Sequence, residues 1–177
     1  NNIMANGTLK VSNIQTSSGS GTITIGQSGE TIAGQATNTP SWSAEGQGLT
    51  VANNTWTELV LTTENFDTDS AYSTSTGRFT VPTGKAGKYH FDYSFGISAN
   101  PDDGEKVNVR LYKNGSAISL SIATAYNSVD GSTSQVRGSY ILDLAVGDYV
   151  SVYGNHNEGS STSDATGSFL GNRLIGA

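Results

Sequence analysis

The sequence contains no cysteine, and this absence excludes a disulfide framework and any metal site built from thiolates. The sequence therefore does not indicate whether the protein works in an oxidising or a reducing compartment. Because no covalent cross-link holds the fold together, its stability must come from side-chain packing or from association between copies. Histidine is almost as scarce, with two residues in the chain, which limits the choice of a general base.

Basic residues are also few. Nine Lys and Arg stand against fifteen Asp and Glu, and the formal net charge is −6. Nucleic-acid binding needs clustered cations that displace counterions from phosphates, and anionic membranes attract the same kind of cluster. No apolar run approaches the length of a membrane span, and the N-terminus lacks the apolar stretch of a signal peptide. We therefore expect a soluble protein with no nucleic-acid partner and no membrane insertion.

The strongest pattern is the run from Lys88 to Ile97, in which every odd position is large and apolar and every even position is polar or small. This period of two predicts a β-strand with one face on a core. Burial of each large side chain contributes about 1.5 to 3 kcal/mol. Five such residues fix the register of the strand, because a shift by one residue would expose the whole stripe.

Glycine is abundant, with 22 residues in a chain of 177, and Gly, Ser and Asn together supply tight turns. No window of the sequence shows a helical period. Asn114-Gly115 between two alternating runs predicts a hairpin, because both residues tolerate a positive φ, and Ile118, Leu120 and Ile122 would form its return strand. Nine or ten short strands indicate an all-β sandwich or jelly roll, and periodicity alone does not choose between these two.

Residues 1–38 are too poor in apolar side chains to form a domain. They hold two short β-like pieces, 9–11 and 22–25, separated by a stretch rich in Gly and Ser. The segment is either a flexible linker or an ordered arm that attaches the protein or pairs with a neighbouring chain. We therefore expect an amino-terminal arm over 1–38 and a β-domain over 39–177.

The chain shows no signature of a catalytic site. His90 lies on the polar face of the run from Lys88 to Ile97, and no Gly-x-Ser-x-Gly or other nucleophile motif is present. We expect no enzymatic activity; a carbohydrate-active enzyme that uses Asp102, Asp103 or Glu105 as its carboxylate pair is the alternative. These three carboxylates also offer the hard oxygen ligands that calcium prefers, although a solvated turn accounts for them as well. No other cofactor is expected.

Function in β-sandwiches is usually carried by loops that a rigid scaffold holds. Three polar segments are expected to be such loops: 98–106, 126–134 and 154–167. Tyr126 and Tyr153 flank the last two segments, and His156 lies within the last. Because tyrosine gives rigid contact area with a polar tip, these residues are candidate ligand contacts. A tyrosine that caps the edge of the core is the alternative.

Several motifs occur in order along the β-domain. A Thr-Gly pair, a Phe and a Pro precede a Gly-x-Tyr-x-Phe strand, and a Leu-x-Leu-x-x-Gly-Asp element and a Ser-Phe-x-Gly strand follow. The residues at these motif positions include Phe79, Tyr89, Phe91, Gly147, Asp148, Phe169 and Gly171. This order resembles the globular head of complement component one, subcomponent q. The resemblance covers roughly residues 42–175. It implies the ten-stranded jelly roll of tumour necrosis factor and assembly as a homotrimer.

The collagen stalk of that family is absent. In its place, the arm is similar to the amino-terminal pieces of small structural proteins from marine bacteriophages. This similarity implies a virion appendage or decoration protein whose trimeric head recognises a host surface glycan or protein, with other virion proteins bound through the arm. Three copies would add avidity to weak single sites. The alternative is a secreted bacterial recognition module of the same fold, so the expected location is virion or extracellular.

Overall fold

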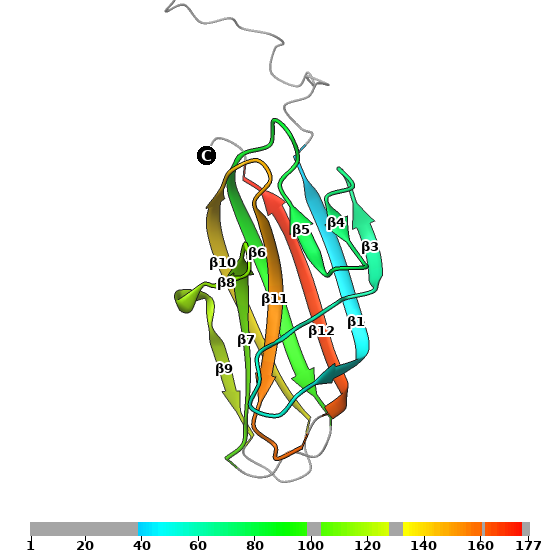
Figure 1. Ribbon diagram of the computed structural model, residues 1–177, viewed down its shortest axis with the longest axis vertical. Coiled ribbons are helices and arrows are strands. Elements are labelled where there is room, and N and C mark those ends of the chain that lie inside the picture. The colour runs from blue at the N-terminus through cyan, green and yellow to red at the C-terminus, as the bar shows by residue number, and fades with distance from the viewer. Residues whose placement is uncertain (1–38, 99–103, 128–132, 161, 175–177) are drawn as a thin grey trace, which may run out of the picture. The chain divides into compact units, whose positions relative to one another are not determined.

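The computed structural model describes residues 39–98, 104–127, 133–160 and 162–174. The expected arm over 1–38 lies outside these residues, as do Asp102 and Asp103. The described part consists of two antiparallel β-sheets joined by turns (Figure 1). It contains one short 3-10 turn, η2 (Ser119–Ser121), and no α-helix. The all-β prediction is confirmed.

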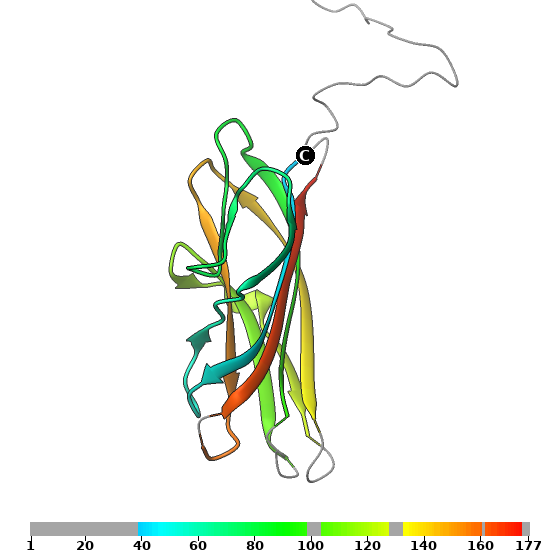
Figure 2. The same cartoon turned by 90° about the vertical axis from the view of Figure 1, so that its right-hand side faces the viewer.

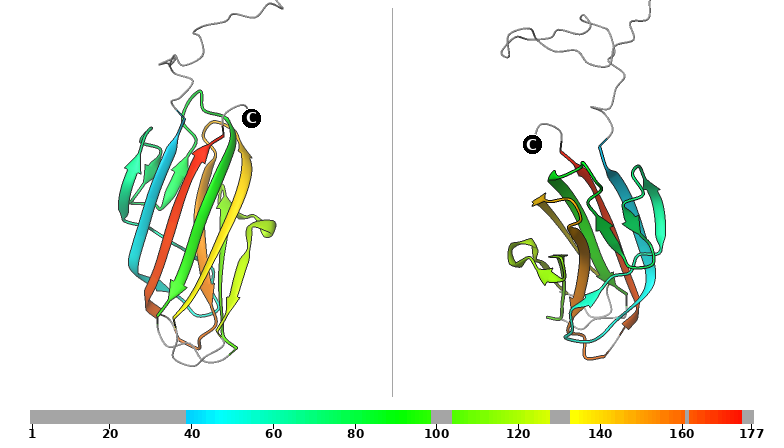
Figure 3. Two further views of the ribbon diagram at one scale, coloured as in Figure 1. Left: turned by 180° about the vertical axis from the view of Figure 1, so that it is seen from behind. Right: turned by 45° about the horizontal axis from the view of Figure 1, so that its top comes forward.

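The first sheet has five strands. Their order across the sheet is β10 (Ser134–Leu144), β6 (Gly87–Ile97), β12 (Thr162–Arg173), β1 (Ser41–Val51) and β3 (Thr63–Asp67). All four pairings are antiparallel. Figure 3 shows this sheet from behind, with β1, β12, β6 and β10 side by side.

The second sheet has seven strands. Its path is β4 (Tyr72–Ser73), β5 (Arg78–Thr80), β11 (Tyr149–His156), β7 (Lys106–Lys113) and β8 (Ser116–Ala117), while β2 (Thr57–Glu58) pairs with β11 and β9 (Ala123–Tyr126) pairs with β7. The described residues form twelve strands, whereas nine or ten were expected, because three of the strands are only two residues long. Figure 2 shows the two sheets edge-on as two layers.

The predicted strand from Lys88 to Ile97 is confirmed as β6. Its five odd-numbered side chains, Tyr89, Phe91, Tyr93, Phe95 and Ile97, are each 2% exposed or less. They point into a core that both sheets share. The even-numbered positions consequently line the outer face of the five-stranded sheet.

Aromatic rings from both sheets meet in the core. Trp42 of β1 stacks on Phe79 of β5 at 3.7 Å between ring centroids. Phe91 of β6 stacks on Phe169 of β12 at 5.8 Å, and both rings meet Trp42 edge-on. Aromatic pairs in such geometries add about 0.5 to 1.5 kcal/mol each beyond the burial of their area. The motif residues Phe79, Tyr89, Phe91 and Phe169 are all fully buried.

Glycines at inward positions make room for these large rings. A Cβ atom placed on Gly171 would lie 2.6 Å from the Trp42 ring and 2.6 Å from the His90 carbonyl oxygen. A Cβ atom on Gly138 would lie 2.4 Å from the Tyr93 ring. The close approach of ring and backbone therefore explains why glycine stands at position 171 of the sequence motif.

The predicted hairpin is present, but its return strand differs from the expectation. Asn114 and Gly115 have φ values of 51° and 78°, and β8 follows them. The expected strand over Ile118, Leu120 and Ile122 is wrong, because the chain forms η2 there and Leu120 is 82% exposed. The Ser121 hydroxyl accepts the Leu111 amide at 2.9 Å. A hydrogen bond to a side chain thus replaces one backbone hydrogen bond between the strands. Serine hydroxyls commonly compete with backbone partners in this way.

The expected loop over 154–167 is also wrong for most of its length. β11 continues to His156, and β12 begins at Thr162. The polar composition suggested a loop, but in β12 Asp164, Thr166 and Ser168 occupy outward positions of a strand while Ala165 and Phe169 point into the core. A polar composition therefore did not mark a loop here.

Asp148 joins two turns at one end of the sandwich. Its carboxylate accepts the Asn114 side-chain amide and the Ala145 backbone amide, each at 2.8 Å, and lies 2.8 Å from Lys113 Nζ. The hydrogen bond to Lys113, then those from Asn114 and Ala145, lower the pKa of Asp148 to about 2. This carboxylate thus ties the 113–116 hairpin to the turn between β10 and β11.

We expect Gly171→Ala to lower the free energy of unfolding by about 1 to 3 kcal/mol, because the added methyl overlaps both the Trp42 ring and backbone. Gly84→Ala is the control. Its Cβ would meet nothing within 4 Å, so it carries only the cost of a positive φ, about 1 kcal/mol. Urea unfolding measures both variants. Equal losses in the free energy of unfolding would show that close packing does not account for the glycine at position 171.

We expect the stabilisation that Asp148 provides to depend on pH. A carboxylate whose pKa is depressed stabilises the fold above its ordinary pKa of 3.8, and that contribution is lost as the pH falls towards 2. Asp148→Asn should therefore lower the melting temperature at pH 7 and much less at pH 2. Asp143→Asn, at an exposed position of β10, is the charge-matched control. A deficit for Asp148→Asn that is equally large at both pH values would contradict this role.

Candidate binding surfaces

The two ends of the β-domain differ. At one end the chain enters β1 and leaves β12 side by side, since the Arg173 amide donates to the Pro40 carbonyl at 2.9 Å. The described residues beside the expected loops 98–106 and 126–134 lie at the other end, where β6 ends and β7 and β10 begin (Figure 1). There the Asn127 amide donates to the Glu105 carbonyl at 2.7 Å. The described ends of the domain and the described residues that flank these loops are therefore at opposite ends.

The two candidate tyrosines both lie on the outer face of the seven-stranded sheet. Tyr126 stands opposite Lys106 at the end of β9 and is 68% exposed. Tyr153 belongs to β11 rather than to a loop; it is half-buried and stacks on Tyr112 at 3.7 Å between ring centroids. Their side chains are available at the surface, so both remain candidate contacts.

His156 is not available to a ligand. It occupies an inward position of β11 and is fully buried. Its Nε2 donates to the Val51 carbonyl at 3.0 Å, and its Nδ1 lies 3.7 Å from Glu158 Oε1. Burial raises the pKa of Glu158, while His156 opposes that rise and Glu105 adds to it. The proposal of His156 as a ligand contact is therefore wrong, because strand alternation directs its ring into the core.

The acidic residues that suggested calcium are only partly described. Asp102 and Asp103 lie outside the described residues, and Glu105 is half-buried just before β7. In the described parts of the chain, no three His, Asp or Glu side chains converge as a metal site. The calcium site and the carboxylate pair of an enzyme thus stay untested expectations.

The outer face of the five-stranded sheet is a flat, largely polar surface. The strand register arranges its side chains in rows. One row consists of Phe66, Ser43, Leu170, Asp92 and Ser139, and the adjacent row of Thr63, Glu45, Ser168, Ser94 and Arg137. The small hydroxyl side chains of Ser168 and Ser94 fill the middle of the second row, so another flat surface can approach closely there.

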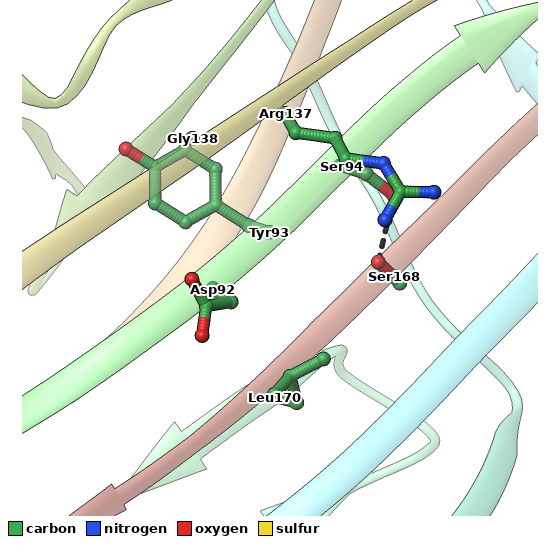
Figure 4. A pocket seen from close by; sticks show the side chains of 7 residues that line it. All are labelled: Asp92, Tyr93, Ser94, Arg137, Gly138, Ser168 and Leu170. Carbon is green, nitrogen blue, oxygen red and sulfur yellow. Dashed lines mark hydrogen bonds between the residues drawn. The ribbon is translucent and has the colours of Figure 1, made fainter.

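Arg137 lies between two shallow hollows on this face. Their volumes are about 280 and 220 Å³. Figure 4 shows the first hollow, where Asp92, Arg137 and Leu170 surround a floor made by Ser94 and Ser168. The two serine hydroxyls are 2.7 Å apart. Among the described residues, neither Arg137 nor Glu45 of the same row has an ion-pair partner.

Exposed apolar side chains stand in two regions. Phe66, Leu170 and Ile141 are spread over the outer face of the five-stranded sheet, on β3, β12 and β10, and are 50%, 38% and 52% exposed. Leu120 and Ile122 form a second patch just before β9, which lies next to the edge strand β10 (Figure 1). We call these the face patch and the edge patch. Sequence reasoning missed the face patch, although a large apolar residue at an outward position of an alternating strand signals it.

Comparisons with known proteins agree with this architecture. The family model of the C1q domain matches residues 42–171. The globular domain of zebrafish complement 1qA protein superposes with a TM-score of 0.56 at 18% identity, covering 76% of this chain and 97% of that chain. No curated protein sequence matches the chain.

Two further solved structures share the fold. PRD1 vertex protein P5 has a TM-score of 0.54 at 14% identity and covers 76% of this chain and 96% of that one. Murine APRIL, solved at pH 5.0, has a TM-score of 0.51 at 10% identity, with coverages of 77% and 100%. At these identities the likeness concerns the fold alone. Among the described residues, no helix is long and apolar enough to cross a membrane.

The family match begins at Trp42 and ends at Gly171. These two residues pack against each other in the core, where the Trp42 ring lies close to the Gly171 backbone. It spans the ordered motifs of the sequence and both β-sheets of the structure. The chain belongs to the C1q domain family.

Proposed function

We propose that this protein is a homotrimeric binding module of a bacteriophage particle, and that it works by recognition rather than by catalysis. The observation that carries the proposal is the pair of separate apolar patches on one chain. A rigid sandwich whose described ends, Pro40 and Arg173, lie opposite the starts of β7 and β10 also suits a protein that is anchored at one end and binds at the other.

The two patches support self-association of the heterologous kind. The face patch lies on a flat sheet surface, and the edge patch lies beside the exposed edge strand β10. When one surface of a chain binds a different surface of the next copy, the assembly closes into a ring if the rotation allows it. The C1q domain family, whose members are typically trimeric, favours closure at three copies.

Charge complementarity favours the same arrangement. Arg137 and Glu45 stand in one row of the five-stranded sheet, separated by Ser94 and Ser168, and neither is paired within the described residues. A neighbouring copy that covers this face can supply the opposite charge to each. Pairs of this kind fix the register of an interface more than they add affinity.

The setting in a phage particle rests on two similarities. The sequence of the arm resembles the amino-terminal pieces of marine bacteriophage structural proteins, and the fold resembles PRD1 vertex protein P5. The alternative is a secreted bacterial module of the same fold. A neighbouring tail or capsid gene favours the first setting, and an upstream signal peptide in the full gene favours the second.

We expect light scattering of the whole chain to give three times the 18.4 kDa mass of one chain. Leu170→Glu should give the mass of one chain at micromolar concentration, because it places an unpaired charge in the centre of the covered face. Val146→Glu is the control, since Val146 is similarly exposed, at 48%, but lies in the turn after β10, apart from both patches.

A single-chain mass for the unmodified protein would overturn the proposal. If Leu170→Glu keeps the trimer while Val146→Glu disrupts it, the interface lies elsewhere. Circular dichroism of both variants establishes that each remains folded.

A further inference from the structure

The outer face of the seven-stranded sheet carries a stack of aromatic and cationic side chains. Arg110 stands opposite Tyr153, and Tyr112 follows two residues along β7 on the same face. The guanidinium carbon of Arg110 lies 4.0 Å from the centroid of the Trp56 ring and 5.1 Å from that of Tyr112. Tyr112 in turn stacks on Tyr153. We call Trp56, Arg110, Tyr112 and Tyr153 the aromatic–arginine surface.

The two arginines of this face differ in their partners. Arg78 makes two parallel hydrogen bonds to Glu58, at 2.9 and 3.1 Å. Burial by itself raises the pKa of Glu58, but the hydrogen bonds, led by that of Arg78, outweigh it and lower the pKa overall. Arg110 has no carboxylate partner in the described residues; it donates to the Tyr112 hydroxyl at 2.9 Å, and its buried Nε has no acceptor.

A second cation and a second ring continue the surface. Lys106 precedes Arg110 by four residues on the same face of β7, a distance of about 13 Å at the rise of an extended strand. Its ammonium group also has no carboxylate partner among the described residues. Tyr126, 68% exposed, stands directly opposite Lys106. Ring and unpaired cation therefore occur together at two places along one strand.

We propose that this face binds an acidic polysaccharide, a chain of sugars that carries carboxylate groups such as uronic acids. Arg110 and Lys106 bind two carboxylates along the chain, and Trp56, Tyr153 and Tyr126 supply flat apolar contact for the sugar rings. Tyr and Trp offer such contact at low cost in conformational entropy. The inference rests on the proposed function, for which it names the ligand class.

A peptide suits this surface less well. Peptides that bind β-sheets pair their backbone with a free strand edge, whereas along its 107–109 stretch β7 is paired on both sides, with β11 and with β9. The surface offers side chains only. It also lies on the sheet opposite the face patch, so the proposed trimer leaves three copies of it free.

The test uses the fluorescence of Trp56 in the whole chain. Trp56 and Trp42 are the two tryptophans, and Trp42 is buried in the core, so a surface ligand changes the signal of Trp56. The probe is a hexamer of galacturonic acid, and its fully methyl-esterified form is the neutral match. We expect the acid form to bind and to weaken as salt is added, and the ester to bind at least about tenfold more weakly.

Variants locate the site. Arg110→Gln should weaken binding of the hexamer at least about tenfold, and Lys106→Gln several-fold, by calorimetry. Lys85→Gln removes the same charge in the turn between β5 and β6, where Lys85 lies 3.8 Å from Asp69, and should leave the affinity unchanged. Circular dichroism reports whether each variant is folded.

Three results would overturn the inference: equal affinity for the acid and its ester, no loss in folded Arg110→Gln, or binding of poly-glutamate but not of the hexamer. Light scattering on the same samples keeps this result separate from the proposed function. A trimer that ignores the hexamer refutes the ligand class alone, whereas a monomer refutes the proposed assembly whatever it binds.

Discussion

The stacking of Trp42 on Phe79 joins one sheet to the other, and the rest of the structure depends on it. Trp42 belongs to the five-stranded sheet and Phe79 to the seven-stranded sheet, and Phe91 and Phe169 close around them. Once these rings fix which residues point inward, the period of two assigns every other residue of each strand to an outer face. The surface chemistry of the protein is in this sense a consequence of its core.

The two outer faces carry different chemistry. On the five-stranded sheet, a floor of serine hydroxyls lies between Leu170 and Arg137, and such a flat surface suits close contact with another protein surface. On the seven-stranded sheet, Arg110 stacks with aromatic rings and has no carboxylate partner among the residues that the structure describes. Self-association on one face and ligand binding on the other are therefore compatible in a single assembly.

Much of the fold was predictable from the sequence, and less of the surface was. The alternation of Lys88 to Ile97 predicted β6 and its inward rings, because one buried face imposes the pattern directly. The return strand after Asn114-Gly115 was mispredicted, because the Ser121 hydroxyl takes the place of a backbone partner, which no periodicity records. His156 was assigned to a loop because small polar neighbours surround it. The contact of Trp56 with Arg110 joins residues far apart in sequence, and only the pairing of strands brings them together.

The central claim is that one outer face is covered by other copies while the opposite face stays open. Since the chain has no cysteine, a single introduced thiol reports the accessibility of one position. Ser139→Cys places a thiol on the five-stranded sheet, and Thr80→Cys places one on β5 of the seven-stranded sheet, away from the edge patch; both positions are exposed within one chain. We expect the thiol at position 139 to react slowly with a labelling reagent at micromolar protein, while that at position 80 reacts at the rate of a free thiol. Equally fast labelling at both positions would contradict the central claim.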